Sequence, residues 1–265
     1  MKKRVISALI ALAIFIPSLL IGKTIFKLFI LMVALLSLNE FLDLRETKYK
    51  LPIPIKLLTF FVFTYLIFNF TTNGFTYSID YQNISLIMFL FLLPIIIYHN
   101  NNVYNINDSM FLIGIVFFLG LSFNLVIILQ EYSVNHVFYL FLIPAITDIY
   151  AYISGNLIGK HKLLPAISPN KTWEGLIVGT VFSVLISAVF YYIAIDSTFN
   201  LGLLFLITAF LSLIGQLGDL VFSSIKRFYK RKDFSNLIPG HGGLLDRLDS
   251  IIFVILAYIL FINIL

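Results

Sequence analysis

Long apolar runs separated by short polar segments occupy almost the whole chain. A helix rises about 1.5 Å per residue, so a run of about 20 apolar residues can cross a bilayer. Runs of this kind predict about nine membrane-spanning helices. They lie at residues 5–22, 25–43, 52–71, 84–99, 109–129, 136–155, 173–194, 201–225 and 248–265. We therefore expect an all-α, polytopic integral membrane protein.

The composition supports a membrane protein rather than a soluble one. Of the 265 residues, 60% are hydrophobic and only 12% are charged, which is far from the composition of soluble domains. The formal net charge of +5 would suit a nucleic-acid partner, but the cations lie in a few loops between apolar runs. We expect no nucleic acid as a partner, and the absence of Cys excludes a disulfide framework.

Lysine and arginine are distributed asymmetrically over the loops. With a cytoplasmic amino-terminus, nine spans place all but two of the 18 Lys and Arg residues on the cytoplasmic side, the exceptions being Lys23 and Lys27. The positive-inside rule favours this orientation. The first run resembles a signal peptide but continues past Lys23 without a cleavage pattern, so we expect a retained helix. The frequent Ile, Phe, Asn and Lys indicate a bacterial source, and hence the bacterial inner membrane.

The two halves of the chain differ in chemistry. Residues 1–130 contain few polar groups inside apolar runs, and we expect them to form a scaffold. Residues 131–265 contain the charged loops and are expected to carry the catalytic groups.

Residues 215–250 concentrate charge between two apolar runs. Asp219, Ser223 and Lys226 recur at helical spacing and share one face of the helix that ends the preceding run. The turn from Pro239 to Gly243 can bring backbone N–H groups close to an anion, and Asp246 follows it at the start of a new helix. Carboxylates beside cations and exposed amides are typical of a phosphate site with Mg²⁺. Alternatively, each carboxylate pairs with a neighbouring Lys or Arg.

Asp148 lies inside an apolar run, where a carboxylate is a functional candidate. Alternatively, it caps a helix that is broken at Pro144. In the next loop, Ser168 and Thr172 can cap secondary structure, and Lys171 adds a cation.

These segments together resemble the phosphatidate cytidylyltransferase family, also called CDP-diacylglycerol synthases. The similarity rests on S-x-I-K-R at Ser223 to Arg227, K-D at Lys232 and Asp233, and P-x-H-G-G-L-x-D-R-L-D at Pro239 to Asp249. Residues 168–175 are similar to the family's S-P-K-K-T-W-E-G loop, with Asn170 in place of the first Lys.

The resemblance implies cytidylyl transfer from CTP to phosphatidate, a Mg²⁺ cofactor, a homodimer and the following site. Catalytic residues are Asp219, Lys226, Arg227 and Asp246, with Asp219 and Asp246 holding the metal and Asp148 and Asp249 as further metal candidates. Substrate-binding residues are Ser168, Lys171, Thr172, Ser223, Lys232, Asp233, His241, Gly242, Gly243 and Arg247.

Two other functions remain open at this point. A CTP-dependent lipid kinase of the polyprenol type would use the same helical setting but transfer the γ-phosphate. A lipid or anion transporter would use the basic loops for binding without chemistry. The carboxylates beside the cations favour metal-assisted phosphoryl chemistry over transport.

Overall fold

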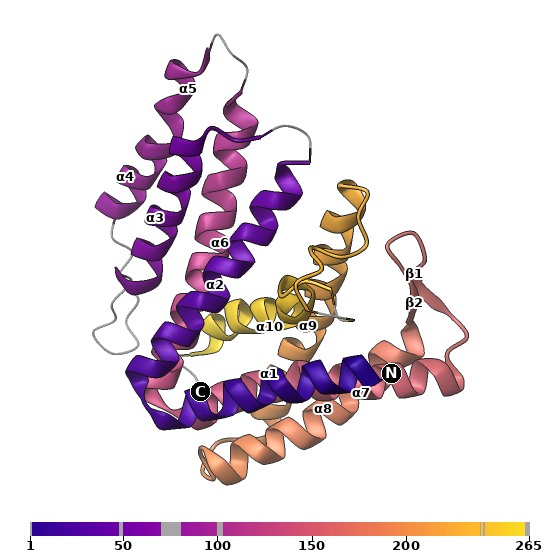
Figure 1. The fold of residues 1–265 in the computed structure, drawn as a ribbon. Helices are drawn as coiled ribbons and strands as arrows, with labels where there is room; N and C mark the ends of the chain where they lie inside the picture. The colour runs from indigo at the N-terminus through magenta and orange to yellow at the C-terminus, as the bar shows by residue number, and fades with distance from the viewer. Residues whose placement is uncertain are drawn as a thin grey trace. The chain divides into compact units, whose positions relative to one another are not determined.

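A computed structural model describes residues 2–47, 50–69, 81–99, 103–238, 240 and 242–262 (Figure 1). The chain forms two compact units, one of residues 24–128 and one of residues 1–23 together with 129–265. The first helix thus belongs to the unit of the carboxy-terminal half, whereas the sequence division at residue 130 assigned it to the amino-terminal half.

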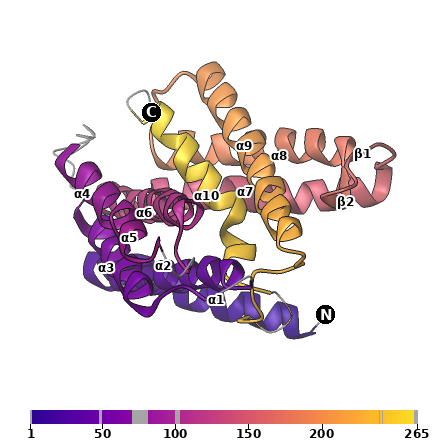
Figure 2. The same ribbon diagram turned by 90° about the horizontal axis from the view of Figure 1, so that it is seen from above.

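The unit of residues 24–128 is a helical bundle (Figures 1 and 2). A buried ion pair between Arg45 and Asp108 joins the end of α2 (Lys23–Arg45) to the start of α6 (Ile106–Tyr132). Asn124 donates to the carbonyl of Ile67 at 2.8 Å, which satisfies a buried amide inside the bundle. Its helices are α2 (Lys23–Arg45), α3 (Ile53–Asn69), α4 (Tyr81–Leu92), α5 (Pro94–Ile97) and α6 (Ile106–Tyr132).

The other unit combines helices with one small sheet. Figures 1 and 2 show α7 and α8 running side by side, and a hairpin at one end of this pair connects them. The hairpin strands are antiparallel, with Lys162 opposite Thr172 and Leu164 opposite Ser168. The elements are α1 (Lys2–Ile21), α7 (Val134–Ile158), β1 (Lys162–Leu164), β2 (Ser168–Thr172), α8 (Trp173–Ala194), α9 (Leu201–Phe228), α10 (Leu245–Tyr258) and the short helix η2 (Ile259–Phe261).

Small residues allow α7 and α8 to pack closely. Gly175, Gly179, Ser183 and Ser187 recur at four-residue spacing on one buried face of α8. A Cβ atom on Gly179 would lie 2.7 Å from the carbonyl oxygen of Thr147 on α7, so only glycine fits there. The hydroxyl of Ser183 donates to the carbonyl of Ile143 at 3.0 Å across the same interface.

Glycines also bring α9 against α10. A Cβ atom on Gly218 would lie 2.6 Å from the Phe253 side chain, and one on Gly215 would lie 2.9 Å from Val254. The close approach places the α9 segment that carries Asp219 beside the α10 segment that carries Asp249.

The helical class is confirmed, whereas the count of nine spans is not. Each predicted run contains helix within the described residues, but only five described helices, α2, α6, α7, α8 and α9, are long and apolar enough to cross a membrane. The others are shorter, and the β-hairpin was not predicted. Its strands contain too few apolar residues to show strand periodicity.

Candidate active site

The candidate site lies within the unit of α1 and α7–α10, at the end that carries the hairpin. Strand β2, the second half of α9 and the first turn of α10 contribute charged side chains, and the connection between α9 and α10 contributes backbone N–H groups. Two lysine–aspartate pairs organise these elements.

The first pair joins the hairpin to α9. The ammonium of Lys171 lies 2.5 Å from Oδ2 of Asp219, and it also donates to the carbonyl of Gln216 at 3.3 Å. Ser223, one turn further along α9, donates to the other oxygen of Asp219 at 3.3 Å. The side chains of Lys171 and Asp219 are 24% and 28% exposed, so a ligand can reach this pair.

Gln216 is a contributor that sequence reasoning missed. Its side-chain amide donates to Thr180 Oγ1 at 2.9 Å, which ties α9 to α8 next to the first pair. A polar side chain inside an apolar run of the sequence was the signal that could have identified it, and the structure shows that this side chain is buried.

The second pair closes the connection between α9 and α10. Nζ of Lys226 lies 2.6 Å from Oδ1 of Asp246, and the two side chains are only 10% and 5% exposed. The other oxygen of Asp246 accepts the backbone N–H groups of Phe234 and Gly243, each at 2.9 Å. Both oxygens of Asp246 therefore have protein partners.

Two further carboxylates, those of Asp148 and Asp249, interact with the first pair. Asp219 and Asp249 lie close enough to influence each other electrostatically, and both are influenced by the charge of Lys226. Asp148 interacts electrostatically with Lys171, Asp219 and Arg247. Because α7 runs unbroken through Pro144, Asp148 does not cap a broken helix. Within the described ranges, no three Asp, Glu, His or Cys side chains are already arranged around one metal position.

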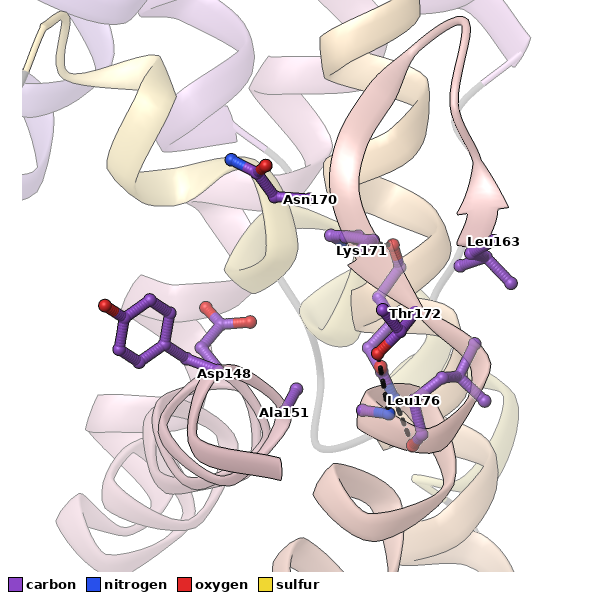
Figure 3. Close-up of a pocket in the computed structure, with 10 residues that line it drawn as sticks. Asp148, Ala151, Leu163, Asn170, Lys171, Thr172 and Leu176 are labelled. Atoms are coloured by element: carbon purple, nitrogen blue, oxygen red, sulfur yellow. Dashed lines mark hydrogen bonds between the residues drawn. The ribbon is translucent and has the colours of Figure 1, made fainter. Parts of the chain in front are cut away.

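A cavity of about 180 Å³ opens beside the first pair. Figure 3 shows the Asp148 carboxylate of α7 and the Asn170 and Lys171 side chains of β2 extending toward the space between these elements. Ala151, Leu163 and Leu176 add apolar walls. The cavity thus combines charged and apolar lining, as an amphiphilic ligand requires.

The base of the hairpin is fixed to α8. Thr172 is buried, and its hydroxyl accepts the N–H of Gly175 at 3.1 Å as the N-cap of that helix. The ring Nδ1 of His161 lies 2.7 Å from Glu174, and the Trp173 N–H donates to the His161 carbonyl. Thr172 has a structural role here, and Lys171 beside it points to α9.

Arg227 and Lys230 belong to the end of α9 rather than to its inner face. Arg227 is exposed, and its guanidinium donates to the carbonyl of Arg231 at 3.2 Å. Lys230 adopts a left-handed conformation with φ of 57°, and the Arg231 N–H closes the helix end on the carbonyl of Lys226.

The remaining predicted residues lie around the connection and the hairpin. Gly242 has φ of 86°, and a Cβ atom there would approach Asp246 Oδ2 to 2.9 Å and Asp233 to 3.2 Å. Lys232, Asp233 and Arg247 are exposed, and Ser168 is half-buried in β2. The prediction for His241 lies outside the described residues.

Known proteins resemble this chain in sequence over almost its whole length. The sequence pattern of the cytidylyltransferase family matches residues 2–265. A phosphatidate cytidylyltransferase of Staphylococcus haemolyticus (strain JCSC1435) is 38% identical over 255 residues, which cover 96% of each chain. The enzyme of the same name from Staphylococcus aureus (strain COL) is 35% identical over the same share of both chains. The chain therefore belongs to the cytidylyltransferase family.

Proposed function

We propose that this protein transfers the cytidylyl group of CTP to phosphatidate, forming CDP-diacylglycerol and pyrophosphate. The observation that carries the proposal is that Lys171, Asp219, Asp249 and Lys226 interact beside a cavity with both charged and apolar lining. The names of the full-length relatives support the same reaction.

The reaction replaces the bond between the α- and β-phosphates of CTP with a bond between the α-phosphorus and phosphatidate. A phosphate oxygen of phosphatidate attacks the α-phosphorus of CTP, the new P–O bond forms, and the bond to the β-phosphate breaks in line with it. Pyrophosphate leaves with the bonding electrons. The phosphate monoester is largely ionised near neutral pH, so the attacking oxygen needs no general base. The protein contributes positioning and charge.

Lys171 is suited to bind a phosphate oxygen of the substrate. An ammonium has three N–H donors, and the described contacts of Lys171 use one on Asp219 and one on the Gln216 carbonyl. The third donor can face the cavity, which Lys171 itself lines. The fixed base of the hairpin keeps this ammonium in place while the substrate binds.

The acidic residues fit a hard divalent cation such as Mg²⁺. Asp219 and Asp249 are oxygen donors whose carboxylates already interact, and Asp148 lies within electrostatic range of Asp219. Asp246 was the predicted partner of Asp219, but its side chain is only 5% exposed and is held by Lys226 and two amides, whereas the Asp219 side chain is 28% exposed. We therefore assign the metal to Asp219 and Asp249. Mg²⁺ bound there would neutralise charge on the phosphates.

The proposed setting is a bacterial inner membrane, with the amino-terminus and the catalytic loops in the cytoplasm, where CTP is available. Phosphatidate would reach the cavity from the bilayer. We also propose that the protein forms a homodimer, because the family resemblance implies one.

Labelled CTP tests the function. Purified protein is incubated with phosphatidate, Mg²⁺ and CTP labelled at either the α- or the γ-phosphate. Transfer of the α-label into lipid is the expected result. Transfer of the γ-label would identify a lipid kinase instead, and transfer of neither label would favour a transporter.

A further inference from the structure

Phe234 is fully buried, although its described neighbours in the connection after α9 are mostly exposed. From Arg231 to Leu237 the side chains are exposed or half-buried, whereas Phe234 is 0% exposed. Its ring packs edge-on against Phe222 of α9, with ring centroids 5.6 Å apart. The ring therefore anchors the connection to the inner side of α9.

Phe234 contacts both members of the second lysine–aspartate pair. The Lys226 ammonium lies 5.5 Å from the centroid of the Phe234 ring, within the range of a cation–π interaction. The Phe234 N–H donates to Oδ2 of Asp246, whose Oδ1 holds the same ammonium. The Lys226 ammonium thus has the Phe234 ring and the Asp246 carboxylate as neighbours. Phe234 contacts the ammonium through its ring and holds the carboxylate through its backbone N–H.

The position of Lys226 matters because its charge acts on the carboxylates of the site. Lys226 lies on the same face of α9 as Asp219, seven residues further along, and its charge acts on both Asp219 and Asp249. A displaced ammonium would leave these two carboxylates less compensated and would move a positive charge away from the phosphates.

We infer that Phe234 is a positioning residue that holds the Lys226 ammonium at the acidic pair, and this inference rests on the proposed cytidylyl transfer for its catalytic consequence. The aromatic face supplies the contact, so the electron density of the ring should matter as well as its volume. An aliphatic residue of similar size cannot replace it fully.

Fluorinated phenylalanines test the inference without altering the packing. Mono-, di- and trifluorophenylalanine are incorporated at position 234, because each fluorine withdraws electron density from the ring face while the shape changes little. The same series at Phe222, equally buried and in contact with Phe234, is the matched control. Thermal unfolding in detergent checks that all variants remain folded.

The first readout is independent of activity. The rate at which an amine-specific reagent labels Lys226 is measured by mass spectrometry, with the exposed Lys230 in the same sample as reference. We expect labelling of Lys226 to rise stepwise along the Phe234 series and to stay constant along the Phe222 series. Constant labelling in both series, or an equal rise in both, would overturn the inference.

The second readout is the rate of cytidylyl transfer. We expect kcat to fall stepwise along the Phe234 series, by roughly 2- to 30-fold for the trifluoro variant, with KM for CTP changing little. A rise in labelling with unchanged kcat would show that the ring holds Lys226 without serving the reaction, which also overturns the inference. Absence of transfer by the wild type would refute the proposed function, while the labelling result still decides whether Phe234 holds Lys226.

Discussion

The Lys171 ammonium and Oδ2 of Asp219 lie 2.5 Å apart, although one belongs to a hairpin strand and the other to an apolar helix. The contact brings two distant sequence motifs to one point beside the cavity. It also means that neither residue can be changed without removing the ionic partner of the other.

Lys171 and Asp219 should behave as one unit in a double-mutant cycle. We expect Lys171→Met and Asp219→Asn each to lower kcat/KM by two to three orders of magnitude, or about 3–4 kcal/mol of transition-state stabilisation. The double variant should be little worse than either single one. The exposed Lys162→Met on the same hairpin is the control and should keep nearly full activity. Additive losses would show that the two residues act separately.

Metal dependence should separate the aspartates. Asn keeps the shape of Asp but removes the anionic ligand, so Asp219→Asn and Asp249→Asn should abolish activity or raise the Mg²⁺ concentration required for half-maximal rate at least tenfold. Asp246→Asn should instead lower stability, because it leaves the buried Lys226 ammonium without its carboxylate. Magnesium titrations of the rate, together with unfolding in detergent, distinguish the two effects. A rise in the Mg²⁺ concentration required for half-maximal rate in Asp246→Asn alone would show that Asp246, and not Asp219 or Asp249, binds the metal.

Lys226 and Lys230 should differ strongly despite their proximity. Lys226→Ala leaves Asp246 buried with one oxygen unpaired and removes a positive charge from the acidic pair, so we expect kcat to fall about 100-fold or more. Lys230 is exposed at the helix end, and Lys230→Ala should change kcat less than threefold. Steady-state kinetics of the two variants side by side make the comparison. Equal losses of kcat would indicate that the two lysines act only through a general attraction to the negatively charged membrane surface.

The α7–α8 contact should depend on a single glycine. A methyl group at Gly179 would collide with the carbonyl of Thr147, so Gly179→Ala should destabilise the protein by about 1–3 kcal/mol. Gly114→Ala in α6 is the matched control, because no heavy atom would lie within 4 Å of its Cβ. That variant should be neutral or stabilised by up to about 1 kcal/mol. Thermal unfolding in detergent measures both, and equal stabilities would contradict the close packing.

The proposed orientation can be checked by reporter fusions. The distribution of Lys and Arg predicts that a reporter at the carboxy-terminus is active only outside the cytoplasm. A fusion in the hairpin at Pro165, between the strands, should give a cytoplasmic signal. A cytoplasmic signal at the carboxy-terminus would show that the number of spans is not odd.

Much of the architecture was accessible from the sequence because burial in hydrocarbon requires continuous apolar helix. Hydropathy therefore located the helices, including α8 and α9, to within a few residues. It did not give the number of spans, because helix length in a protein interior depends on packing as well as on bilayer thickness. Nor did it show that α1 joins the later helices, since any apolar helix can pack on any other.

The sequence predicted which charged residues belong to the site, but it did not predict which of them pair with each other. Charge density identified Asp219, Lys226 and Asp246, yet the sequence suggested that the two carboxylates converge on a metal. In the structure a separate lysine reaches each of them, Lys171 from the hairpin and Lys226 from α9. Phe234 escaped notice because one more Phe among 28 carries no signal in an apolar chain.

The bonds of Asp246 also constrain the order in which the protein can be made. The ribosome synthesises α9 and the connection after it before α10. Lys226, Phe234 and Gly243 therefore enter the growing chain before Asp246, whose carboxylate contacts all three. Until the first turn of α10 has been synthesised, these groups have no common acceptor. Lys226 is therefore set in its final position only after Asp246 has been synthesised, and a translation product that stops short of α10 carries an unassembled site.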